Sequence, residues 1–231
     1  MGKIGLINNL IKLFLPKVCV ACKTELLDGE MGACLRCIYK IPRTFNYRKV
    51  NNSAELIMSG RIPFERIATF SYFTEDSVLR PMIHNLKYYN GKDIGVLLGK
   101  MFGEDLLKSD FISSIDIIVP VPLHPKKQRS RGYNQAEIIA NGISDATKLP
   151  VVTNKLKRVV YNPTQTKRTK TERWRNVKGI FEIMDTSFFE GKHILLVDDV
   201  ITTGSTIEAC GIALQKCNNL KISIAAIGEV L

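Results

Sequence analysis

The chain has few histidines, a single tryptophan and no long uninterrupted apolar run. Among 231 residues there are three histidines and one tryptophan. The most apolar stretch, residues 1–16, is interrupted by Asn8, Asn9 and Lys12 and has no small-residue cleavage site. It is too short to span a bilayer and does not match a secretory signal. We therefore expect a cytoplasmic protein with no integral membrane segment.

The apolar residues of the same stretch recur at the spacing of an amphipathic helix. Ile4, Ile7, Ile11 and Phe14 fall on one face of a helix. The opposite face lacks the strong positive charge of membrane-surface helices. We expect this face to dock on the protein body in preference to peripheral contact with a membrane.

Basic residues outnumber acidic residues in this chain. There are 33 Lys plus Arg against 22 Asp plus Glu, which gives a formal net charge of +11 and a pI near 9.4. Such an excess favours anionic partners, either phosphates or nucleic acid, although an inert basic surface is the alternative.

Cysteine is used in a way that predicts a metal site. Cys19, Cys22, Cys34 and Cys37 form two Cys-x-x-Cys pairs with a short spacer between them. Each pair can place two thiolates on one ion, and four thiolates make a closed tetrahedral zinc site of the ribbon type. Disulfides are the alternative, but nothing marks the chain as secreted.

The remaining two cysteines, Cys210 and Cys217, follow an apolar helical stripe and are expected in the core. The composition turns polar after residue 50. We place a domain boundary near residue 48, which gives an N-terminal helix and zinc ribbon (1–48) and a second domain (49–231).

Residues 191–206 combine a fold signal with site chemistry. The branched residues 194–197 predict a strand buried on both faces, and Asp198 and Asp199 are expected at its exit. A loop rich in hydroxyl groups follows and leads into a helix; it consists of Thr202, Thr203, Gly204, Ser205 and Thr206. Gly204 permits a positive φ, and backbone N–H groups at a helix start bind phosphate. Carboxylates can bind ribose hydroxyls or Mg²⁺, so the pair of features fits a 5-phosphoribosyl ligand.

A second strand, loop and helix precede this unit. Residues 116–119 predict a short strand and 134–148 a helix, with a proline-rich basic loop between them. The cations of that loop are Lys126, Lys127, Arg129 and Arg131. Parallel strands bring their carboxyl ends to one edge, so the loop can face the same crevice and hold pyrophosphate. A solvated basic loop is the alternative.

The motifs resemble those of a known family. Leu-Leu-Val-Asp-Asp-Val-Ile-Thr-Thr-Gly-Ser-Thr (195–206) is similar to the signature of type I phosphoribosyltransferases, whose shared substrate is phosphoribosyl pyrophosphate (PRPP). Three further features resemble the ComF family (ComFC and GntX-like proteins): the four cysteines, His-Asn-Leu-Lys-Tyr (84–88), and Val-Pro-Val-Pro-Leu-His-Pro-Lys-Lys (119–127) with Arg-Gly-Tyr-Asn-Gln-Ala-Glu (131–137). The resemblance covers almost the whole chain. It implies an α/β fold with the parallel sheet of a type I phosphoribosyltransferase.

The resemblance also assigns a role to the most basic segment, residues 155–178. It places a mobile loop at 164–175 that closes over PRPP, with Lys167, Arg168, Arg173, Trp174 and Arg175. The same cations and tryptophan could bind single-stranded nucleic acid. A merely solvated charge run is the alternative.

Together these interpretations predict a protein that binds PRPP with Mg²⁺, with Asp198 and Asp199 as the catalytic residues. The resemblance implies a role with single-stranded DNA, and with competence-machinery proteins, in natural transformation. No histidine or carboxylate stands out as a general base, so two alternatives stay open. One is a non-catalytic module that responds to PRPP, and the other is a phosphoribosyltransferase for an unidentified small acceptor.

Overall fold

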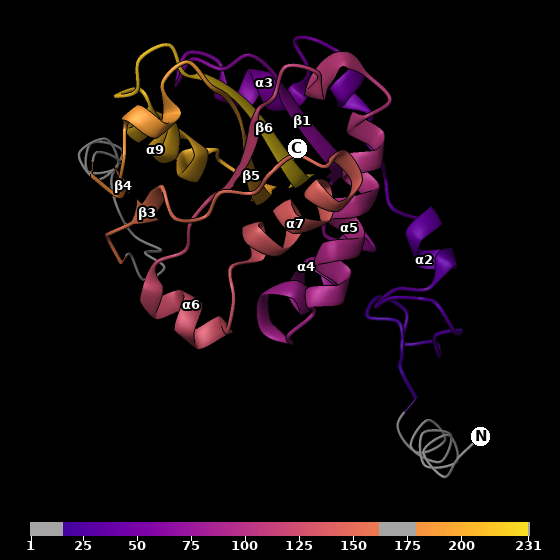
Figure 1. The fold of residues 1–231 in the computed structure, drawn as a ribbon. Coiled ribbons are helices and arrows are strands. Elements are labelled where there is room, and N and C mark those ends of the chain that lie inside the picture. The colour runs from indigo at the N-terminus through magenta and orange to yellow at the C-terminus, as the bar shows by residue number, and fades with distance from the viewer. Residues whose placement is uncertain (1–15, 162–178, 231) are drawn as a thin grey trace.

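A computed structural model describes residues 16–161 and 179–230 of the chain (Figure 1). The predicted helical face of residues 4–14 and the predicted loop 164–175, with its five site residues, lie outside this described part. The described elements are, in order, α2 (Leu35–Tyr39), η1 (Asn46–Arg48), α3 (Ser53–Met58), β1 (Ile67–Tyr72), α4 (Leu79–Tyr88), α5 (Lys92–Leu106), η2 (Asp110–Ile112), β2 (Ile117–Pro120), α6 (Pro125–Arg131), α7 (Gln135–Thr147), β3 (Leu156–Arg158), β4 (Phe181–Ile183), η3 (Ser187–Phe189), β5 (His193–Ile201), α9 (Ser205–Leu214) and β6 (Lys221–Glu229).

The main sheet has four parallel strands in the order β1-β6-β5-β2. β5 and β6 lie in the middle, and their apolar residues 194–197 and 224–227 suit strands that are covered on both faces. β3 and β4 form a separate antiparallel pair. The predicted parallel α/β fold is confirmed.

Successive residues of β5 point to opposite sides of the sheet and divide the core in two. Leu195 and Val197 belong to the cluster that includes α4, α5 and α7. Ile194 and Leu196 belong to the cluster that includes α3 and α9. Figure 1 shows α9 on one side of the sheet and the three helices α4, α5 and α7 grouped on the other. Period-two alternation within a continuous apolar strand therefore builds both layers.

The helices α5 and α7 pack closely because glycines face each other across their contact. A Cβ at Gly142 would overlap the carbonyl oxygen of Val96, and one at Gly99 would overlap the carbonyl oxygen of Ile139. The close approach holds the layer of helices against the sheet beside the candidate site.

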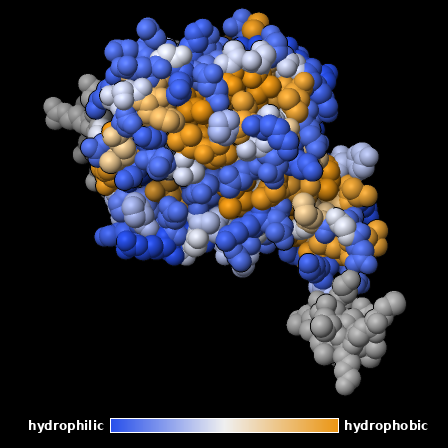
Figure 2. All heavy atoms as spheres, in the orientation of Figure 1, coloured by the Kyte–Doolittle hydropathy of each residue, from blue (hydrophilic) through white to orange (hydrophobic). Residues whose placement is uncertain are grey.

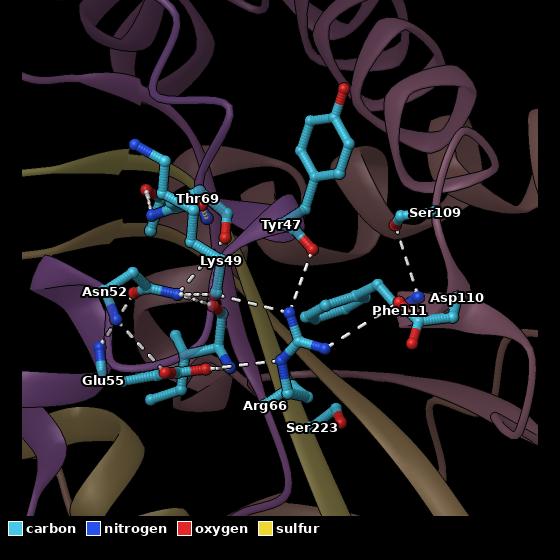
Figure 3. A network of polar contacts seen from close by, with 12 residues as sticks. Tyr47, Lys49, Asn52, Glu55, Arg66, Thr69, Ser109, Asp110, Phe111 and Ser223 are labelled. Carbon is cyan, nitrogen blue, oxygen red and sulfur yellow. Dashed lines mark hydrogen bonds and ion pairs between the residues drawn. The ribbon is translucent and has the colours of Figure 1, made fainter.

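A polar network joins the segment after the cysteines to the first strand of the sheet (Figure 3). The Arg66 guanidinium donates to the carbonyl oxygens of Tyr47 (3.1 Å) and Lys49 (3.3 Å) and pairs with Glu55 at 3.6 Å. Asn52 caps α3 and donates to the carbonyl oxygen of Ile67 at 2.9 Å. These bonds run across residue 48, where the domain boundary stays a prediction.

Two predictions about local structure are wrong: the end of the strand at the acidic pair, and the conformation of the basic loop. The strand predicted for 194–197 is longer: β5 has nine residues, so the two aspartates lie inside it and not at its exit. Pairing with β6, which extends as far, continues the strand beyond its apolar part.

The basic loop predicted between 123 and 131 is largely the helix α6. His124 caps it by accepting the Lys126 N–H through Nδ1 at 3.2 Å, and Pro125 occupies its first turn. Gly132, at φ 82°, ends it in the left-handed conformation. Proline at the start and glycine after the end are sequence signals for a short helix.

The contact between α5 and α7 generates a stability prediction. Gly142→Ala should lower the free energy of unfolding by about 1–3 kcal/mol, because the added methyl group overpacks the helix crossing. Asn141→Ala is the matched control, since Asn141 is exposed on the same helix and alanine favours helix. Urea unfolding measures both variants. An unchanged midpoint for Gly142→Ala would contradict the packing described here.

Candidate active site

The acidic pair is uncovered because neighbouring strands end at different levels. The last β2 residue, Pro120, pairs with Val197, whereas β6 continues alongside β5 as far as Ile201. Asp198 and Asp199 therefore lie beyond the end of β2 while still held in β5. They line a cleft of about 340 Å³ at the carboxyl edge of the sheet, where open α/β folds bind ligands.

Four cations line this cleft, and within residues 16–161 and 179–230 three of them have no carboxylate partner. Lys87, from α4, forms an ion pair of 3.0 Å with Asp199. Among the described residues, Lys127, Arg131 and Arg158 make no ion pair with a carboxylate, although Arg131 donates to the amide oxygen of Gln135 at 2.7 Å. Burial and the nearby charges of Arg131, Arg158 and Lys87 lower the pKa of Lys127. The cleft is thus electropositive and suited to an anion.

Of the four cations predicted to hold pyrophosphate, the helix α6 directs two toward the cleft and two away from it. Lys127 and Arg131 are one helical turn apart and line the cleft. Lys126 and Arg129 are exposed and are not among the cleft residues. The ammonium group of Lys126 lies 5.7 Å from the centre of the Tyr161 ring. The structure thus brings two of the four predicted cations to the acidic pair.

The predicted phosphate loop has the expected backbone. Gly204 has a φ of 73° and stands at the N-cap of α9, a helix of ten residues. Thr202 and Thr206 line the cleft, and the hydroxyl groups of Thr203 and Ser205 are 2.9 Å apart. The loop therefore offers hydroxyls and free N–H groups at a helix N-terminus, which suits an anion.

The far side of this loop is braced by α3 and the residues after it. A Cβ at Gly204 would overlap the sulfur of Met58 and approach Arg61. Arg61 donates to the carbonyl oxygen of Thr203 and lies 3.6 Å from Glu208. Only glycine fits at this point, because both the positive φ and the close neighbour exclude a side chain.

The two carboxylates of the pair have different environments. Asp199 is paired with Lys87, while burial, together with the charge of Asp199, raises the pKa of Asp198 to about 7. One Asp198 oxygen accepts the N–H of Asp199 at 2.8 Å. Asp198 thus changes protonation near neutrality, and a cationic ligand would favour its ionised form.

Some cleft residues were missed or undervalued in the sequence. Arg158 was counted only as part of the basic segment, and nothing in its neighbourhood singles it out. Asn134 and Gln135 also line the cleft, at the start of α7. Lys87 carried a signal, since it belongs to the His-Asn-Leu-Lys-Tyr motif. None of these residues could be joined to the aspartates without the three-dimensional fold.

The four predicted metal ligands lie together in the N-terminal part of the chain. The sulfur atoms of Cys19, Cys22, Cys34 and Cys37 all lie within 4.8 Å of one another. Cys22 and Cys34 are 3.7 Å apart, and the N–H of Cys34 donates to the Cys19 sulfur at 3.4 Å. Tetrahedral zinc with bonds of about 2.3 Å places sulfurs about 3.8 Å apart, so the cluster fits this ion. Hydrogen bonding between the Cys22 sulfur and Thr24 contributes most to a lowered pKa of Cys22, about 6.

The other cysteines are separate from this cluster. Cys210 and Cys217 are buried, as expected, and burial raises the pKa of both thiols. Both are core residues.

The comparisons with known proteins agree with the geometry of the cleft. The model of the phosphoribosyl transferase domain matches residues 114–229. The chain belongs to this family. The matched region includes the acidic pair, the phosphate loop and α6.

Relatives that align with most of the chain narrow this class. The chain is 26% identical to competence protein F of Haemophilus influenzae, over 89% of this chain and 94% of that protein. It is 28% identical to competence protein ComFC of Bacillus subtilis, over 83% and 75% of the two chains. It is 25% identical to the DNA utilization protein YhgH of Escherichia coli, over 84% and 89%. These relatives confirm the resemblance to the ComF family.

Within residues 16–161 and 179–230, no helix has the length and apolar character needed to cross a membrane.

The shifted pKa of Asp198 gives a pH-dependent prediction. Its pKa in the folded protein, about 7, exceeds the unfolded value of about 3.9, so the folded state binds more protons between these limits and loses stability as the pH rises. Asp198→Asn removes this loss and should raise the melting temperature relative to wild type at pH 8, with little difference at pH 4.5.

The measurement is thermal unfolding without added ligand or divalent cation, with exposed Asp76→Asn as the control. A melting temperature for Asp198→Asn below that of wild type at pH 8 would show that the ionised carboxylate is stabilising and the sign is wrong.

Proposed function

We propose that the cleft at the carboxyl edge of the sheet binds PRPP. The observation that carries the proposal is the meeting of three groups in one cleft: two carboxylates, a phosphate loop, and cations that have no carboxylate partner. PRPP has a chemical counterpart for each group, in its ribose hydroxyls, its 5-phosphate and its pyrophosphate.

Each part of the cleft then has a task. The 202–206 loop holds the 5-phosphate through its N–H and hydroxyl groups. Lys127 and Arg131, with Arg158, neutralise the pyrophosphate and its charge as it leaves. Asp198 and Asp199 accept hydrogen bonds from the ribose hydroxyls and stabilise the positive charge that develops at C1. Lys87 holds Asp199 in place.

Mg²⁺ fits the same cleft because carboxylate oxygens are its preferred protein ligands. Asp198 and Asp199 would hold it together with oxygens of the substrate. The ion would supply charge neutralisation for the pyrophosphate.

The four-cysteine cluster is proposed to hold a structural zinc ion. Four thiolates leave no open position for catalysis, so its task is to fold the N-terminal part of the chain. The spacing of the sulfur atoms is the support for this assignment.

The names of the relatives, together with the basic cleft, lead to the second half of the proposal. We infer that the protein acts on single-stranded DNA in natural transformation, in the cytoplasm and with other competence proteins. The net charge of +11 supports a polyanionic partner. Among the described residues of the cleft there is no histidine, and its carboxylates are the two aspartates. Apart from these aspartates, to which the proposal assigns the ribose hydroxyls, the described part of the cleft has no general base. Turnover therefore has to be measured to separate binding of PRPP as a ligand from transfer to an acceptor.

The aspartates provide the first test. Asp198→Asn and Asp199→Asn should each weaken binding of PRPP in the presence of Mg²⁺ by about 10- to 100-fold, because each removes charged hydrogen bonds to the sugar. Isothermal titration calorimetry measures this, with Asp76→Asn as the control. Retention of full affinity by both variants would overturn the assignment of the cleft.

Turnover separates the remaining alternatives. Pyrophosphate release from PRPP that depends on added single-stranded DNA would identify a transferase acting on nucleic acid. Intact PRPP combined with altered DNA affinity would identify a ligand-responsive binding protein. Release that depends on a small nucleophile instead would identify an enzyme with a small acceptor.

The zinc assignment has its own test. The protein purified without chelator should contain one zinc ion, and Cys37→Ser should lose it and unfold at a lower temperature, because a structural metal contributes directly to folding. Cys210→Ala should keep the metal, since this cysteine lies outside the cluster. Elemental analysis measures the content, and a Cys37→Ser protein with full zinc would exclude the cluster as the site.

A further inference from the structure

A second cleft lies between the cysteine cluster and α4. It has a volume of about 420 Å³ and joins the turn after Cys19 to one side of the helix. The residues that line it are Val20, Lys23, Arg80, Pro81, His84, Asn85 and Tyr89. None of them lines the first cleft. The two clefts therefore lie on different parts of α4.

Aromatic rings gather at the edge of the second cleft, where α4 ends. The His84 ring lies 4.9 Å from the Tyr88 ring and 5.5 Å from the Tyr89 ring. The two tyrosines are 61% and 68% exposed, so the core does not account for their presence. Adjacent exposed rings of this kind form a platform on which a planar group can stack.

The polar part of the cleft is positive. Lys23 comes from the turn of the cysteine cluster and has a φ of 64°, a conformation that lysine seldom adopts. Arg80 is about half exposed, and its partner Glu75 is an exposed carboxylate 3.9 Å away, a distance at which water screens the attraction. No carboxylate lines the cleft among the described residues. The cleft thus combines stacking surface with two cations that are held in place, since Lys23 Nζ donates to the carbonyl oxygen of Val20 at 3.2 Å and Arg80 to that of Glu75 at 3.3 Å.

The platform also reaches toward the first cleft. Tyr88 lines the first cleft, and the Arg131 guanidinium lies 5.2 Å from the centre of its ring. The rings of His84 and Tyr88 therefore lie between the cations of the second cleft and Arg131 of the first. Adjacent rings flanked by cations suit a polymer of bases and phosphates better than a single small anion.

We infer that this second cleft is a nucleotide-binding subsite for single-stranded nucleic acid. One base stacks on the ring of His84 and the next on the ring of Tyr89, because the two rings are tilted by 46° and cannot share one planar partner. Lys23 and Arg80 bind the adjoining phosphates. A single strand is required because the bases of a duplex are stacked on each other and cannot reach the rings. The inference rests on the nucleic-acid half of the proposed function and assigns that partner to a surface apart from the PRPP cleft.

The experiment compares the rings of the cleft with an equally exposed ring elsewhere. His84→Ala and Tyr89→Ala should each weaken binding of a fluorescent oligothymidylate of about 20 nucleotides by about 10-fold, in the range expected for the loss of one stacking partner. Tyr39→Ala is the control, since Tyr39 is 88% exposed on α2 and does not line the cleft. Fluorescence anisotropy is the measurement, and a duplex of the same length should bind more weakly than the single strand.

A charge variant tests the phosphate contact. Arg80→Gln should reduce the slope of log affinity against log salt by about one between about 50 and 200 mM salt, whereas exposed Arg36→Gln should leave the slope unchanged. Equal slopes for the two variants would remove Arg80 from the site.

Further arms of the experiment separate the sources of the same chemistry. Thymidine monophosphate that binds as tightly as the oligonucleotide would make the ligand a free nucleotide and overturn the assignment to a strand. Inorganic phosphate that competes equally well would reduce the site to an anion site and overturn the role of the rings. Weak competition by both supports the strand.

The PRPP titration is repeated on the same variants, so that failures can be told apart. PRPP affinity should be unchanged in His84→Ala, because His84 does not line the PRPP cleft. Wild-type protein that binds no oligonucleotide would defeat both this inference and the nucleic-acid half of the proposed function. Wild-type binding that His84→Ala and Tyr89→Ala leave unaltered would defeat only the inference.

Discussion

Neighbouring strands of the main sheet end at different levels, and this difference creates the candidate site. β5 continues beyond the end of β2 but remains paired with β6. This leaves two aspartates on a rigid strand with one side open. Pairing with β6 fixes the backbone of both aspartates, and their side chains leave the strand on opposite sides. The raised pKa of Asp198 follows from burial first and from the nearby charge of Asp199 second.

Charge then organises the surroundings of the pair. Lys87 from α4 balances one carboxylate, whereas Lys127, Arg131 and Arg158 pair with no carboxylate in the part of the chain that the structure describes. Such a cluster destabilises the empty protein through mutual repulsion, and an anionic ligand relieves it. The free energy of folding that this repulsion costs is recovered when an anion binds in the cleft.

Much of the fold could be predicted from the sequence, because apolar runs of branched residues mark parallel strands and glycine marks the turn at 204. The bounds of β5 could not, since its last residues are held by pairing with β6 and not by their own hydrophobicity. The helix α6 did have a signal in Pro125 and Gly132, which the basic residues between them obscured.

The residues of the candidate site also fall into those that a local sequence pattern predicts and those that it does not. Residues in consecutive motifs, such as Asp198 and the 202–206 loop, were found because short-range spacing carries their chemistry. Arg158 reaches the cleft from the separate β3–β4 pair and Gln135 from the start of α7, and no local pattern shows that these elements meet the end of β5. Only the knowledge that α6 is helical shows that Lys127 and Arg131 face the cleft while Lys126 and Arg129 do not.

The position of α4 has a consequence for communication within the molecule. His84 faces the cleft beside the cysteine cluster, and Lys87, three residues further along the same helix, holds Asp199. A rigid helix cannot shift at one of these residues and stay still at the other. If a ligand at one cleft moves α4 and thereby changes the affinity of the other cleft, equilibrium requires the two effects to be equal in size.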